Sequence, residues 1–564
     1  MKGDRRNGQG RRPTLGDAIS DASRSGLQRL GRELEQRVRQ RIDAQLARPR
    51  GPWRERSPAG QARPAVLRPG PPAQPIASIA RAPTKRDDVP QSKAIAPARD
   101  IRKVPSAPVA PVRWELPPHA AVREALPKWI GAHDRATMEA ALERGAAAGD
   151  PGQDGEPLYA MVGLDFGTSC SKIIVRFPEE AGAPAIAIPA PAHCRSGADP
   201  YLWQTVVWVR RDGTFLPWPE PDAYPLHTLK QGIMGERPTA VVAPNYGSMP
   251  ITYLDAATAY LSFAIRYARG WLLLNQPERF RGRRPYWFTN MGLPAANYDD
   301  SKLVTGYRAV AATALVLAGS GERIAIETTR AFASTKEVRE AAGSAAAAEA
   351  LGIAIFPEVA AEVAGFMKSS AGGSGLYLVV DVGAMTLDIC AFRFRQRQGD
   401  GDFYPLLEAD VHHLGVEAYH WFIGAGRTHE AFSGECGRVL RQLVLKTRRD
   451  RDPNASCWQP GNDLPVFLVG GGSANLLHRA AVEGLDPLLK GLLKNEGIRL
   501  TALPQPTGLT MPEPGGDFAR LPVAWGLSYA PTEIGEVMAP SEIPDVPRAT
   551  VRDYLGSYVS KDQM

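Results

Sequence analysis

The chain has 564 residues, of which 44% are hydrophobic, 23% charged and 8% aromatic, enough to bury a core of several hundred residues. This excludes a wholly disordered protein and a coiled coil. Its five cysteines lie far apart without a C-x-x-C pair, which argues against a disulfide framework or zinc module and favours the reducing cytoplasm. Without a long apolar window or the apolar stretch of a secretory signal, we expect a cytoplasmic protein with no transmembrane segment.

Charge divides the chain into two parts. Residues 1–112 carry 24 Lys and Arg against 10 Asp and Glu, whereas residues 113–564 carry 43 against 50. The sequence therefore predicts an acidic globular part with a cationic arm, and the basic pI gives only weak support for nucleic-acid binding by the globular part.

The arm consists of two segments. Within residues 1–47, apolar residues mostly three or four apart predict an amphipathic helix over 14–47, with arginines on its other faces. Residues 48–112 contain 14 prolines and predict a disordered linker, because burial cannot offset the cost of ordering this backbone. The mixed charges of the helix favour a protein partner or self-assembly through the arm, with nucleic acid and acidic membrane as weaker alternatives.

The remainder predicts a mixed α/β fold, because short β-rich runs alternate with helical stretches. Residues 113–158 read as a helical lead-in that ends in a turn-rich segment. The predicted strands span 159–165, 172–177, 204–209, 286–290, 377–382, 387–393 and 465–469. The predicted helices span 119–131, 133–147, 255–274, 300–318, 335–350, 357–368, 415–424, 430–448 and 474–493.

A first motif begins where a buried strand ends at Asp165. A glycine turn with hydroxyl side chains follows, and then a second buried strand, which predicts a β-hairpin whose turn can cradle an anion. Gly167 lets the backbone approach the anion, and Thr168, Ser169 and Ser171 can face phosphate oxygens. The Asp165 carboxylate can hold Mg²⁺ through water.

A second motif repeats this plan about 216 residues later, in residues 376–392. A buried strand ends at Asp381, the turn contains Gly383 and Thr386, and Asp388 follows at the start of the next strand. Two such hairpins facing each other would clamp a polyphosphate from both sides.

A third motif is a buried strand that runs into a triple glycine, Gly470, Gly471 and Gly472, followed by Ser473 and a helix. This geometry places a nucleoside or phosphate against backbone at a helix N-terminus. Each motif alone is a common turn, but the three in this order are far more specific. The glycine patterns of P-loop and dinucleotide-binding folds are absent, which disfavours those folds.

Together these segments resemble the superfamily of actin, sugar kinases and heat-shock chaperones, and most closely the DnaK-type (70-kDa) heat-shock chaperones. Residues 162–172 are similar to the phosphate-1 loop, 379–388 to phosphate-2 and 466–473 to the adenosine loop. Weaker similarities follow the family's order at 286–302, 357–361, 413–417 and 523–527.

The resemblance implies a two-lobed actin-like ATPase fold of duplicated ribonuclease-H-like lobes, preceded by the largely disordered basic arm. Lobe I would span 159–376 with a crossing helix, and lobe II 377–530 with a reduced outer subdomain. Residues 531–564 would form a C-terminal tail. The implied cofactors are ATP or ADP with Mg²⁺.

The family roles carry over to particular residues of this chain. Asp165 and Asp381 would hold hydrated Mg²⁺, and Asp381 would position the attacking water. The residues implied to contact phosphate or orient its loop are Gly167, Thr168, Ser169, Gly383, Thr386 and Asp388. Those implied to contact adenosine are Gly470, Gly471, Gly472, Ser473, Glu435 and Arg438. The family's phosphate-binding lysine would be Lys230 or Lys172, unless either is a solvated surface charge.

The chain also departs from the family. Phe356 stands where the chaperones carry a catalytic glutamate, so that only Glu358 could substitute, and Ala384 and Met385 replace two usual glycines. We therefore expect slow or absent hydrolysis. Since only about 35 residues follow the helix near Tyr529, we expect no peptide-binding domain and infer an ATP-dependent conformational switch for a protein partner. The alternatives are a filament-forming ATPase and a catalytically inactive scaffold, with a small-molecule kinase less favoured.

Overall fold

The structure is a computed structural model that describes residues 130–148, 155–235, 238, 250–369, 372–397 and 401–546. All of these residues belong to one unit of the chain. The predicted arm helix, the linker, nearly all of the predicted helix 119–131 and the end of the tail lie outside the described residues.

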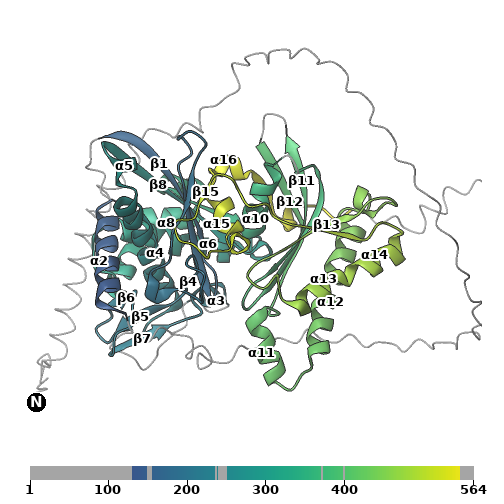
Figure 1. Cartoon of the computed structure of the whole chain (residues 1–564), viewed down its shortest axis with the longest axis horizontal. Helices are drawn as coiled ribbons and strands as arrows, with labels where there is room; N and C mark the ends of the chain where they lie inside the picture. The colour runs from purple at the N-terminus through teal and green to yellow at the C-terminus, as the bar shows by residue number, and fades with distance from the viewer. Residues whose placement is uncertain are drawn as a thin grey trace, which may run out of the picture. The chain divides into compact units, whose positions relative to one another are not determined.

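The described part is a mixed α/β fold with two large sheets (Figure 1). The first sheet has the order β15-β3-β2-β1-β8-β9, with β4 (Trp203–Gln204) paired to β2. Its strands are β1 (Glu156–Asp165), β2 (Cys170–Arg176), β3 (Ala185–Ala187), β8 (Arg283–Leu293), β9 (Ile353–Pro357) and β15 (Leu509–Thr510).

The second sheet has the order β14-β13-β10-β11-β12-β16. Its strands are β10 (Gly375–Val382), β11 (Leu387–Arg397), β12 (Gly401–His412), β13 (Leu464–Val469), β14 (Ile498–Thr501) and β16 (Glu536–Met538).

The two sheets repeat one topology. In each, the first three strands pair antiparallel in chain order, and the next two strands lie parallel on the other side of the first. In each, a short strand from the C-terminal region pairs parallel to the third strand. Both hairpins predicted from the sequence, β1–β2 and β10–β11, therefore occupy the same position in their sheets.

A small third sheet and the helices complete the described part. The third sheet has the order β6-β5-β7, formed by β5 (Val207–Arg210), β6 (Phe215–Leu216) and β7 (Ala223–Leu226). The helices that precede β9 in the chain are α2 (Ala132–Ala147), α3 (Leu229–Met234), α4 (Tyr253–Asn275), α5 (Pro277–Phe280), α6 (Ser301–Ala318), α7 (Ile326–Ala333), α8 (Lys336–Gly343) and α9 (Ala345–Leu351). Later helices are α10 (Glu358–Met367), α11 (Val416–Gly424), α12 (His429–Lys446), α13 (Leu476–Glu483), α14 (Leu485–Leu493), α15 (Pro522–Leu527) and α16 (Pro531–Ile534).

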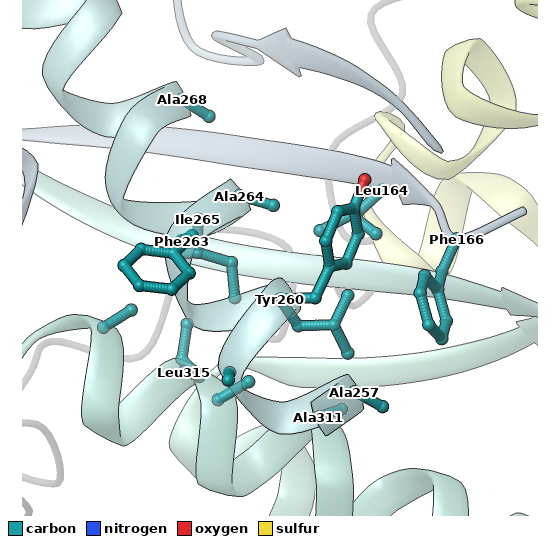
Figure 2. Packing of buried hydrophobic residues seen from close by; sticks show 14 of the residues in the cluster. Leu164, Phe166, Ala257, Tyr260, Phe263, Ala264, Ile265, Ala268, Ala311 and Leu315 are labelled. Atoms are coloured by element: carbon teal, nitrogen blue, oxygen red, sulfur yellow. The ribbon is translucent and has the colours of Figure 1, made fainter. Parts of the chain in front are cut away.

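The core of the first sheet fixes the first hairpin turn. Helix α4, which starts at a capping box formed by Thr252 and Asp255, packs with α6 against the sheet (Figure 2). Phe166, the first residue after β1, is fully buried beside Tyr260 of α4, with ring centroids 5.8 Å apart. This aromatic contact anchors the turn that follows.

Helices α10 and α15 lie between the two large sheets (Figure 1). Helix α10 follows β9 of the first sheet but packs against strands of the second, whereas α15 lies in the chain between β15 of the first sheet and β16 of the second and packs against the first. The two helices touch where Gly526 of α15 meets Ala361 of α10, since a Cβ on Gly526 would lie 1.6 Å from the Ala361 carbonyl oxygen. Each helix therefore ties one sheet to the other.

Most predicted elements are confirmed, with ends that differ by a few residues, but three are divided. The predicted strand 204–209 is interrupted at Thr205 and Val206, and the predicted helix 335–350 is broken at Ser344, which caps α9. The predicted helix 474–493 is broken at Gly484, because Pro487 cannot continue the helical hydrogen bonds. Strand β12 was not predicted, since its Pro405 argues against a central strand.

No helix in the ranges given above is long and apolar enough to span a membrane.

Candidate functional site

A cavity of about 160 Å³ brings the two predicted hairpin turns together. Residues of the first turn, of the second turn and of the glycine segment after β13 all line it. The lining residues predicted from the sequence are Asp165, Gly167, Thr168, Ser169, Lys172, Lys230, Glu358, Asp381, Gly383, Thr386, Asp388, Gly470 and Gly471. Ala384 and Met385, which replace the usual glycines, line it as well.

Thr205 holds the first turn in place. Its hydroxyl donates to the Gly167 carbonyl at 2.8 Å, and its backbone N–H donates to the Ser169 carbonyl at 2.8 Å. The hydroxyl also lies 3.1 Å from that of Ser171 in the buried interior. Because Thr205 bonds to the turn instead of to a strand, the predicted strand 204–209 is interrupted there.

The start of α11 holds the second turn. The backbone N–H groups of Gly415, Val416 and Glu417 donate to the carbonyls of residues 385, 383 and 384 in that order. The Glu417 carboxylate also accepts a hydrogen bond from the Ser169 hydroxyl at 3.2 Å. Glu417 thus joins the first turn to the second across the cavity.

Both candidate lysines reach the cavity, and each is paired with a carboxylate. Lys172 Nζ lies 2.8 Å from Asp165 Oδ2 across the β1–β2 hairpin, where the two residues are register partners. Lys230 Nζ lies 2.5 Å from Glu358 Oε1, and both residues are buried. Neither lysine is a solvated surface charge, so that alternative is wrong.

The ion pairs determine the charge state of the lysines. Burial alone would lower the pKa of Lys172, but Asp165 raises it above its ordinary value. Burial would likewise lower the pKa of Lys230, and Glu358 together with Asp165 raises it. Both lysines therefore stay protonated.

The backbone just before Lys230 has an unusual conformation. Thr228, two residues earlier, has a φ of 54°, in the left-handed region that a β-branched residue rarely adopts. Strained backbone of this kind persists where the surrounding structure fixes it, and it often occurs at functional sites.

Five carboxylates line the cavity beside the two lysines: Asp165, Glu358, Glu362, Asp381 and Asp388. Burial, and then the negative charge of Glu358, raises the pKa of Asp381 to about 7. Burial and the neighbouring carboxylates also raise the pKa of Glu362 and of Asp388 well above their ordinary values. The cavity therefore has an excess of acidic groups that bound protons or a divalent cation would offset.

The absence of a side chain at Gly470 leaves room for the Asp381 carboxylate. Its φ is 84°, and a Cβ on this residue would lie 1.9 Å from Asp381 Oδ1. Only glycine fits at this point, so the third motif packs directly against the aspartate of the second.

Five predicted residues do not reach the cavity, among them Ser171, which is fully buried. Gly472 and Ser473 follow the two lining glycines but are not among the lining residues. Glu435 and Arg438 lie on the solvent side of α12, where they pair with each other. Their proposed contacts with adenosine stay predictions.

Sequence reasoning missed three residues of the site. Glu362 lies one helical turn after Glu358, a spacing that places both carboxylates on one face of α10 and could have been noticed. Arg520 and Glu417 reach the site through tertiary contacts that no local spacing indicates. Phe356 packs beside the α10–α15 crossing, whereas Glu358 lines the cavity.

The acidic groups fit a hydrated Mg²⁺ better than a directly ligated metal. Glu362 is 3% exposed and has neither a hydrogen bond nor an ion pair in the described part, and one oxygen of Asp388 is buried without a hydrogen bond. However, no three His, Cys, Asp or Glu side chains within the described ranges are arranged to hold a metal. Water and phosphate oxygens would therefore supply most ligands, as Mg²⁺ often requires.

The chain was also compared with known proteins. Neither the models of protein families nor the curated proteins gave a match to this chain.

Proposed function

We propose that the chain is an ATP-binding protein with a two-lobed actin-like fold, in which each large sheet belongs to one lobe. It would be a slow Mg²⁺-dependent ATPase that acts as a conformational switch for a protein partner. The observation that carries the proposal is the repeated strand order, with the Asp-x-Gly turn of each repeat lining the same cavity. Two turns from equivalent hairpins can contact one polyphosphate from opposite sides.

In this proposal the residues that line the cavity have different roles. Asp165 and Asp381 would hold hydrated Mg²⁺, which neutralises phosphate charge when bound. The Lys172 and Lys230 ammonium groups would stabilise charge on the phosphate oxygens. Asp381, with its pKa near 7, would orient the attacking water and accept its proton.

The size of the cavity agrees with phosphate as the enclosed part of the ligand. Pockets for whole small molecules usually measure roughly 300–1,000 Å³. The cavity of about 160 Å³ is smaller, so the nucleoside would extend past Gly471 toward solvent.

The contact between α10 and α15 supports the switch. Because α10 packs on the second sheet, α15 packs on the first and the two helices touch, closure of the cavity around a ligand would move both helices. Such a rearrangement would alter the surface that a partner binds.

A catalytically inactive scaffold is the second candidate. Ala384 and Met385 line the cavity where two glycines are usual in the family, and the carboxylates that stay ionised there repel an anion that arrives without a cation. A filament-forming ATPase stays an untested alternative, which sedimentation with and without ATP would reveal.

Calorimetry and phosphate release on the full chain test the proposal. We expect wild type to bind ATP with Mg²⁺ and to hydrolyse it slowly. Asp165→Ala should lose Mg²⁺-dependent binding, whereas Asp381→Ala should weaken that binding only in part and lose turnover by about 100-fold or more, because the proton acceptor is removed as well. Asp463→Ala, which removes a carboxylate paired with Arg499 away from the cavity, is the control. Absence of ATP binding by wild type would favour the scaffold.

A further inference from the structure

Arg520 lies at the open rim of the cavity. It ends the short 3₁₀ turn Phe518–Arg520 just before α15, and its side chain lines the cavity although the residue is exposed. Its guanidinium carbon is 4.0 Å from the position that a Cβ on Gly471 would occupy. The guanidinium therefore lies beside the glycine segment that follows β13.

The same side chain is close to the first hairpin. Burial raises the pKa of the Cys170 thiol, and the positive charge of Arg520 is among the weaker effects that lower it. Cys170 is the first residue of β2 and lines the cavity. Arg520 thus lies near both the first motif and the third.

Three cationic side chains line the cavity within the described ranges: Lys172, Lys230 and Arg520. The two lysines are neutralised by Asp165 and Glu358. Arg520 has no ion pair and no side-chain hydrogen bond in the part of the chain that the structure describes. An anion that enters the cavity therefore meets an uncompensated positive charge at Arg520.

The backbone of Arg520 is well held, so the side chain starts from a fixed point. Its N–H donates to the Asp517 carbonyl at 3.1 Å, and the Asp517 carboxylate accepts from the Ala519 N–H at 2.9 Å. Helix α15 follows at once and packs against the first sheet. Because the backbone at Arg520 is already ordered, its planar N–H donors can bind a ligand without the entropic cost of ordering a loop.

We propose that Arg520 is a phosphate-binding residue that contacts the polyphosphate of a nucleoside di- or triphosphate at the rim of the cavity. The guanidinium offers two parallel N–H donors that match phosphate oxygens. Its charge offsets part of the repulsion from the carboxylates deeper in the cavity. This inference rests on the proposed nucleotide function, and it assigns a contact that neither hairpin supplies.

Isothermal titration of the full chain with ATP, magnesium pyrophosphate and adenosine tests the assignment, with Mg²⁺ present throughout. Arg520→Ala should weaken ATP and pyrophosphate binding by roughly ten- to a hundred-fold, because a charged hydrogen-bonded contact is lost. Arg520→Lys should recover part of the loss, since lysine keeps the charge but not the paired donors. Adenosine binding should not change.

Arg499→Ala is the matched control, because this exposed arginine on β14 pairs with Asp463 and does not line the cavity. The unfolding midpoint of each variant should equal that of wild type, which shows that the fold is intact. Equal ATP affinity in wild type and Arg520→Ala would overturn this inference alone. Equal losses of affinity for ATP and for adenosine would mean that Arg520 contacts the nucleoside, and this result would overturn the inference too. Absence of ATP binding by wild type would overturn both proposals.

Discussion

Lys230 and Glu358 show what a single buried ion pair contributes to this molecule. Lys230 lies on α3 and Glu358 begins α10, 128 residues later, and each is less than a tenth exposed. Two charges out of water are tolerated only while each neutralises the other. The pair therefore fixes the position of both side chains in the cavity more than it adds to stability.

This arrangement predicts a non-additive pair of substitutions. Lys230→Met should lower the free energy of unfolding by about 3–5 kcal/mol, because it leaves the Glu358 carboxylate buried without its cation. Combining it with Glu358→Gln should recover most of the loss, since both charges are then absent. Urea unfolding of the two single variants and the double variant measures the coupling.

An exposed pair provides the control. Lys490 lies 2.9 Å from Asp486 on α14 and its side chain is 53% exposed, so Lys490→Met should cost less than about 1 kcal/mol. If Lys230→Met lowers the free energy of unfolding no more than Lys490→Met does, then Lys230 does not neutralise a buried Glu358 charge.

At the scale of elements, the crossing of α10 and α15 depends on close contact between two backbones. The contact brings the Ala361 carbonyl so near to Gly526 that no side chain fits between them. Both helices are short, with ten and six residues, so their stability comes from packing and not from intrinsic propensity.

We predict that Gly526→Ala lowers the free energy of unfolding by about 3 kcal/mol or more, because the helices must separate to admit the methyl group. Gly434→Ala is the matched control in the interior of α12, where a Cβ would meet nothing within 4 Å. That substitution should stabilise the protein by about 0.5–1 kcal/mol, since alanine favours the helix. Thermal unfolding of both variants tests the contrast, and equal effects would contradict it.

At the scale of the whole molecule, the contact between α10 and α15 makes the two sheets depend on each other. Loss of the second sheet would uncover the apolar residues of α10, and loss of the first would uncover those of α15. Neither sheet keeps its full core alone, although each repeats a complete strand order.

We therefore expect the two sheets to unfold in one transition. Hydrogen exchange followed by mass spectrometry at increasing urea concentration should show amides of β1 and β10 losing protection at the same midpoint. Two separate midpoints would mean that the sheets are independent folding units and that α10 and α15 do not couple them.

Local signals in the sequence determined much of the fold. The strands at 159–165 and 377–382 and the helices at 255–274 and 300–318 were predictable, because apolar periodicity and capping residues act within a few residues. The Asp-x-Gly turns and the glycine segment were predictable for the same reason. Their order along the chain also indicated that they would meet in one site.

Only the tertiary structure decided which side chains complete that site. The partners of Lys172 and Lys230 were open in the sequence, and so was the position of Glu358 in the cavity. Arg520 is 355 residues from Asp165 along the chain, yet both line the same cavity. Such contacts depend on how sheets and helices pack, because residues far apart in sequence leave no periodic signal that a local pattern could carry.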